Sequence, residues 1–65
     1  MSPAMVRLDE ALRVLEAYEI VTARRRQRFL STKGSERIRW RAMWYEAIEQ
    51  LEAAQKRVAE LTGDV

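Results

Sequence analysis

The 65-residue chain has no cysteine, no histidine, only two glycines and one proline. Without cysteine it forms no disulfide and offers no thiolate to a metal ion. Without histidine it lacks the side chain that most often serves as a general base near neutral pH or as a zinc ligand. Its apolar runs are only a few residues long, which argues against a membrane-spanning segment or a signal peptide. We therefore expect a cytoplasmic protein with no metal, cofactor or membrane partner.

The residues that are abundant favour a small, soluble helical protein. Hydrophobic residues make up 48% of the chain and charged residues 34%, a balance typical of folded rather than disordered chains. A chain of this length forms at most one domain, and a core of this size rarely supplies more than about 3–5 kcal/mol of stability. A partner chain would therefore stabilise it.

One internal turn signal divides the chain into two halves. Residues 31–35 read Ser-Thr-Lys-Gly-Ser, and no other glycine or proline lies between Pro3 and Gly63. The pattern predicts an all-α single domain with helices at about 3–31 and about 35–62, joined by a turn at about 31–35. Each helix would be roughly 40 Å long at about 1.5 Å per residue.

Residues typical of helix ends stand at the predicted boundaries. Ser2, directly before a proline, is typical of an N-cap. We expect Gly34 to take a left-handed C-cap conformation, with Ser35 or Thr32 capping the second helix. Gly63 is expected to end that second helix.

Each predicted helix carries a stripe of mainly apolar residues with alternating spacings of four and three. This is the heptad repeat of a coiled coil, in which positions a and d face the partner helix. Larger residues mostly occupy position a, and smaller residues mostly occupy position d. The stripe comprises Ala4, Leu8, Ala11, Leu15, Tyr18, Thr22, Arg25 and Phe29 in the first helix, and Trp40, Trp44, Ala47, Leu51, Ala54, Val58 and Leu61 in the second.

The two stripes predict one antiparallel register. In a hairpin of two helices, the numbers of residues that face one another have a nearly constant sum. Leu15 and Leu51 sum to 66, and Arg25 and Trp40 sum to 65. The stripes therefore predict a two-helix antiparallel coiled-coil hairpin, with Arg25 facing Trp40 as an internal cation–π pair.

Further apolar residues flank the seam and make the stripe wider than a two-stranded coiled coil needs. On a free hairpin part of this surface would be wet, and such patches usually mark a contact. We expect two hairpins to pack as a four-helix bundle, a homodimer. The alternatives are a higher or hetero-oligomer and a slightly splayed monomer. The predicted interface residues are Met5, Leu12 and Ile48 at position e and Val14, Val21 and Met43 at position g.

In length, hairpin register and alternating alanine and leucine layers, the chain resembles the ROP family of plasmid-encoded, RNA-binding hairpin dimers. This resemblance is architectural. It implies a dimeric bundle that contacts paired RNA loops through one face, using polar, basic and aromatic side chains. By analogy with other proteins of this size and build, it also suggests a phage or plasmid protein.

The net charge of +2 conceals a division of charge along the chain. Residues 24–41 hold eight basic side chains against Glu36 alone, a formal charge of +7. The rest of the chain holds four basic against nine acidic side chains, a formal charge of −5. The predicted hairpin therefore has a basic tip and acidic arms. Seven of the eight basic tip residues are arginines, which bind phosphate or carboxylate bidentately.

Two interpretations account for the basic tip. In the first, two hairpins pack with their tips at opposite ends, so that each tip lies against the acidic arm of its partner. In the second, the tip binds the phosphates of RNA or DNA, and an outward-pointing Tyr45 stacks on unpaired bases. The candidate contacts to nucleic acid or to an acidic protein surface are Arg24, Arg26, Arg28, Lys33, Arg37, Arg39, Arg41 and Tyr45.

No set of residues in the sequence nominates an active site, which would need a pocket with a perturbed nucleophile or base. We therefore expect a non-catalytic interaction or assembly protein, a self-associating hairpin whose arginine-rich tip binds a partner and which has no small-molecule substrate. The alternative is an RNA- or DNA-binding regulator of the kind that the ROP resemblance implies.

Overall fold

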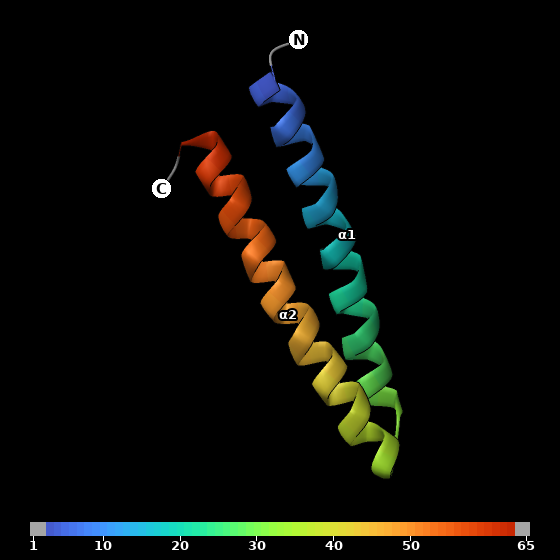
Figure 1. Ribbon diagram of the computed structural model, residues 1–65. Helices are drawn as coiled ribbons and strands as arrows, with labels where there is room; N and C mark the ends of the chain where they lie inside the picture. The colour runs from blue at the N-terminus through green and yellow to red at the C-terminus, as the bar shows by residue number, and fades with distance from the viewer. Residues whose placement is uncertain (1–2, 64–65) are drawn as a thin grey trace.

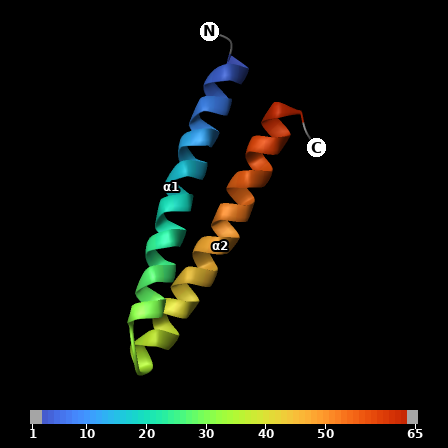
Figure 2. The same ribbon diagram turned by 180° about the vertical axis from the view of Figure 1, so that it is seen from behind.

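The computed structural model describes residues 3–63, with side chains described for residues 6–63. It contains two α-helices, α1 (Pro3–Ser31) and α2 (Ser35–Thr62), which pack against each other in antiparallel directions (Figure 1; Figure 2). The prediction of an all-α hairpin is confirmed. The expected N-cap, Ser2, lies outside the described residues.

The turn between the helices depends on Gly34. Its dihedral angles, φ 77° and ψ −154°, lie in a region that essentially only glycine adopts. The expectation of a left-handed C-cap was wrong, because α1 already ends at Ser31 and Gly34 instead forms the N-cap of α2. The expected cap by Ser35 or Thr32 was also wrong, since no side chain caps α2 and Ser35 is its first residue.

The far end of α2 follows the sequence-based expectation. Gly63 adopts the left-handed conformation, with φ 82° and ψ 12°. Its amide donates to the carbonyl oxygens of Ala59 and Glu60, the latter at 3.3 Å. The Thr62 hydroxyl also donates to the Ala59 carbonyl, at 3.0 Å. These bonds satisfy carbonyls that a helix end otherwise leaves without a partner.

The buried core between the helices consists of alanines. Ala47 is fully buried, and Ala54 and Ala11 are 8% and 9% exposed. All three occupy position d, where a small side chain lets the helix axes approach closely. The larger residues at position a are half-buried, as Leu15 and Leu51 show. Among the described residues, no large side chain is fully buried.

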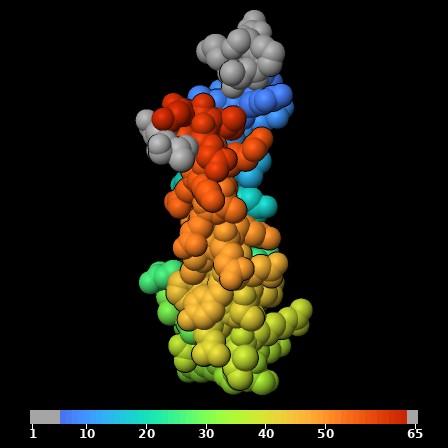
Figure 3. Space-filling view, turned by 60° about the vertical axis from the view of Figure 1, so that its left-hand side comes forward, coloured from blue at the N-terminus to red at the C-terminus, as the bar shows by residue number. Residues whose placement is uncertain are grey.

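The hairpin is long and thin. Its radius of gyration is 14.8 Å and its extents are 50 × 20 × 12 Å, whereas a compact chain of 65 residues has a radius of gyration of about 11 Å. The helices lie closest near the turn and diverge toward the opposite end (Figure 1). The space-filling view has the same slender outline (Figure 3). One layer of two helices therefore leaves two broad faces uncovered.

Candidate functional site

The predicted basic tip exists as a structural unit at the closed end of the hairpin. The last two turns of α1, the turn and the first two turns of α2 bring residues 24–41 together (Figure 1). Arg25 is half-buried between the helices. The other basic side chains of the tip are exposed, namely Arg24, Arg26, Arg28, Lys33, Arg37, Arg39 and Arg41.

The charges of the tip are not neutralised within the hairpin. In the described part of the chain, none of its basic side chains forms an ion pair with a carboxylate within 4.0 Å. Glu36 is the single acid of residues 24–41. A concentration of guanidinium groups that have no carboxylate partner attracts anionic partners at long range and at contact.

A guanidinium and three aromatic rings form a row beside the turn, in which Phe29 and Trp44 are stacked and Tyr45 is tilted 37° against Trp44. The Arg37 guanidinium lies over the Phe29 ring, 4.6 Å from its centroid. The Phe29 and Trp44 centroids are 5.6 Å apart with the rings 25° from parallel, and the Trp44 and Tyr45 centroids are 5.4 Å apart. Tyr45, at the outer end of this row, is 54% exposed, as the sequence predicted.

The direction of helical side chains explains why Phe29 meets Trp44. Side chains lean toward the N-terminus of their own helix. The N-terminus of α2 is at the tip, so Trp44 leans toward the tip, while Phe29 on α1 leans away from it. The two rings therefore meet although their backbone positions lie at different levels.

The same lean overturns the predicted pair of Arg25 and Trp40. Trp40 leans toward the tip and receives the guanidinium of Arg28, which lies 5.7 Å from the ring centroid. Arg25 instead donates from Nη1 to the backbone carbonyl of Met43 at 2.9 Å. The cation–π interaction at Trp40 exists, but a different arginine makes it.

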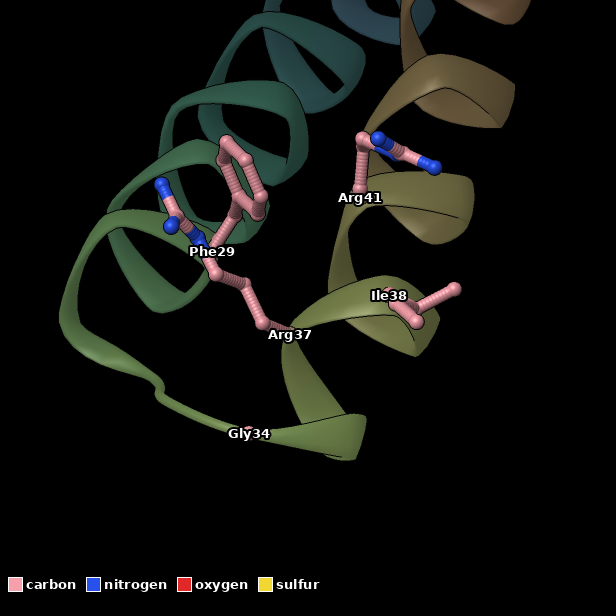
Figure 4. Close-up of a pocket in the computed structure, with 5 residues that line it drawn as sticks. All are labelled: Phe29, Gly34, Arg37, Ile38 and Arg41. Atoms are coloured by element: carbon pink, nitrogen blue, oxygen red, sulfur yellow. The ribbon is translucent and has the colours of Figure 1, made fainter.

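A shallow pocket of about 280 Å³ opens beside the turn, lined by Phe29, Gly34, Arg37, Ile38 and Arg41 (Figure 4). The Arg37 side chain reaches from α2 to the Phe29 ring of α1 (Figure 4). Ile38 is 64% exposed and adds an apolar wall. The pocket thus combines an apolar lining with two cationic groups.

The predicted interface residues lie on both sides of the seam rather than in one patch, because heptad positions e and g flank the seam on opposite sides. Leu12 and Val14 are 44% and 48% exposed, while Val21, Met43 and Ile48 are half-buried. The side chain of Met5 lies outside the described residues.

Sequence reasoning missed Leu30, which is 57% exposed next to the turn. The sequence signal that could have identified Leu30 was its heptad position b, which lies next to position e, the position of Leu12 and Ile48.

The described residues contain no group of three or more acidic side chains placed to hold a metal ion. Neither described helix has the length and apolar character needed to cross a membrane. No family model, no curated protein and no solved structure matches the chain. Its function is therefore inferred from its own residues.

Proposed function

We propose that this protein is a non-catalytic interaction protein that self-associates as two hairpins in a four-helix bundle and uses its arginine-rich tip to bind a partner. One observation carries the self-association: in the described part of the chain the fully packed core is made of Ala11, Ala47 and Ala54. Three alanines bury too little apolar surface to offset the entropy of ordering two long helices.

A second hairpin supplies what the first lacks. Large half-buried residues such as Leu15, Leu51 and Trp44 line the seam, and Leu12 and Val14 extend the apolar surface at 44% and 48% exposure. Packing another hairpin over one side of the seam covers part of this wide apolar stripe, as in a four-helix bundle. The splayed monomer leaves the same surface in water.

The non-catalytic part of the proposal is supported by the pockets. The pocket beside the turn is lined by arginines and apolar groups around Gly34. A second pocket, on the arms, is lined by Arg7, Glu10, Arg57 and apolar residues. Neither lining places a nucleophile beside a general base, which covalent and acid–base catalysis need.

Sedimentation velocity at low micromolar concentration tests the proposal. We expect a species of twice the 7.7 kDa chain mass. The variant Leu12→Asp is expected to shift the protein toward monomer, because it buries a carboxylate in the interface. Ile20→Asp, at an equally exposed position on the outer side of α1, is the matched control and should leave the mass unchanged. A wild-type monomer would refute self-association.

Nucleic-acid binding is the second candidate for the tip. It is favoured by the tip arginines, which have no carboxylate partner among the described residues, and by Tyr45, whose exposed ring packs beside Trp44. Arginines that neutralise phosphates give salt-dependent affinity, and an exposed ring offers a surface for an unpaired base.

Titration with mixed RNA and with duplex DNA at several salt concentrations tests this candidate. Binding should weaken steeply with salt, and the triple variant Arg24→Glu, Arg26→Glu, Arg28→Glu should abolish it. Tyr45→Ala should weaken binding to single strands more than to duplexes. Absence of binding at low ionic strength would remove nucleic acid as the partner.

A further inference from the structure

The hairpin has two broad faces, one on each side of the seam. Heptad positions e and b form one face, which we call the Tyr45 face, and positions g and c form the other, the Val14 face. The contacts agree with this division, since one pocket joins Ile38 and Arg41 at the tip of the Tyr45 face. The other pocket joins Arg7, Val14 and Arg57 on the arms of the Val14 face.

Exposed apolar side chains are concentrated on the Tyr45 face. Of the large hydrophobic residues that the structure exposes, Val14 alone belongs to the Val14 face, while Val6 and Ile20 point away from both faces. The remaining four lie on the Tyr45 face, and half-buried Ile48 lies at its centre. These four are Leu12 at 44%, Leu30 at 57%, Ile38 at 64% and Tyr45 at 54% exposure.

The Tyr45 face is also divided by charge. Its tip carries Arg26 and Arg41, both exposed. Its arms carry acids and no basic residue. These acids, all exposed, are Asp9, Glu16, Glu19 and Glu52.

The Val14 face lacks this division. Its tip is basic through Arg24, Arg28 and Arg39, but its arms carry Arg7 and Arg57 beside the acids. Arg7 and Arg57 line the pocket there. A basic tip placed on these arms would meet arginines, so the two ends of this face do not complement each other.

We propose that the Tyr45 face is the dimer interface and that the second copy of this chain lies on it with its tip at the opposite end. This inference rests on the proposed self-association and specifies its face and orientation. A two-fold axis that lies between the two packed faces, at their middle and perpendicular to the helices, relates the protomers. It places Arg26 and Arg41 of each protomer against the acidic arm of the other. The same rotation lays Tyr45 and Leu12 against the partner's apolar residues.

The area of the face is sufficient. A face 50 Å long and 20 Å wide has a plan area on the order of 1,000 Å² per protomer, compared with roughly 800 Å² per partner in an interface of standard size. The opposite orientation, with the tips side by side, would bring Arg26 and Arg41 against their own equivalents and leave the carboxylates facing one another.

A single cysteine tests the orientation, because the chain has none of its own. Lys33→Cys places a spin label on the exposed turn, and pulsed electron spin resonance then measures the distance between the two labels of a dimer. We expect a distance close to the 50 Å length of the hairpin. A distance under about 20 Å, as for labels on adjoining helices about 10 Å apart, would overturn the proposed orientation.

Matched charge reversals test the face. Arg26→Glu with Arg41→Glu makes the tip of the Tyr45 face acidic, and the dissociation constant is expected to rise about tenfold or more. Arg24→Glu with Arg39→Glu makes the same charge change on the Val14 face, at two exposed arginines, and should leave the dissociation constant within about threefold. Circular dichroism at high concentration checks that both variants remain helical.

A second variant distinguishes interface charge from a general effect on folding. Glu16→Arg, Glu19→Arg and Glu52→Arg together change the formal charge of the arm of the Tyr45 face from −4 to +2 and should weaken the variant's own dimer. Mixed with the Arg26→Glu, Arg41→Glu chain, it should restore a mixed dimer of near wild-type affinity, because both tip-to-arm contacts are again of opposite sign. A dimer that resists the Arg26 and Arg41 reversals but dissociates with the Arg24 and Arg39 reversals would overturn this inference and leave self-association intact.

Discussion

Three alanines set how closely the helices of this protein pack. Ala47 has no exposed surface, and Ala11 and Ala54 are almost as fully buried. Ala47 leaves no room for a larger side chain, whereas Ala11 and Ala54 border the pocket on the arms. The leucines at position a line the seam and stay half-buried, so that part of their surface can contact a second hairpin.

Ala47→Leu is expected to destabilise the protein by about 1–3 kcal/mol, because three added carbon atoms must force the helices apart. Thermal unfolding followed by circular dichroism measures the change. Ala53→Leu adds the same atoms at an exposed position on the same helix and is the control, expected within about 0.5 kcal/mol of wild type. Equal unfolding temperatures for the two variants would contradict close packing at Ala47.

Individual side-chain partners were the least predictable feature from sequence. Heptad spacing placed Arg25 and Trp40 at the same level, but it contains no information on how far each side chain leans along its helix. Because the side chains lean along their helices, Trp40 contacts Arg28, and Arg25 donates a hydrogen bond to the Met43 carbonyl. Long arginines choose among several acceptors within reach, and spacing along the chain does not rank them.

At the scale of elements, the turn depends on one backbone conformation. The sequence predicted where the helices meet, because glycine and proline are otherwise absent from the middle of the chain. It did not predict how Gly34 is used. A glycine with a positive φ can either end the first helix or precede the second. Which role Gly34 takes depends on the residue at which α1 ends, and sequence does not fix helix ends to within one or two residues.

Gly34→Ala is expected to destabilise the hairpin by about 1–3 kcal/mol, because an L side chain is strained at φ 77° and ψ −154°. No atom lies within 4 Å of the position that the new Cβ would occupy, so the effect comes from the backbone alone. Urea unfolding measures it. Gly34→Asn is expected to lose a similar amount of stability, because the strain lies in this extended positive-φ region. Near wild-type stability of Gly34→Ala would show that the turn adopts another conformation.

At the scale of the whole molecule, folding and association are expected to be one process. The chain is far longer than a compact protein of its size, with extents of 50 × 20 × 12 Å, and no large side chain in residues 6–63 is fully buried. The sequence predicted this incomplete burial, since an apolar stripe wider than the intramolecular seam has no partner within one hairpin. It could not show which of the two faces carries more of the exposed apolar surface.

Dilution is therefore expected to unfold the protein rather than release helical monomers. Because only the folded chains associate, each tenfold increase in concentration should raise the thermal midpoint by about 3–6 °C, as follows from about 1.4 kcal/mol of linkage. Circular dichroism at several concentrations, read beside sedimentation on the same samples, should show helix content and dimer mass falling together. A concentration-independent midpoint, or monomers that keep full helicity, would show that the alanine core and its half-buried flanks suffice to fold one hairpin alone.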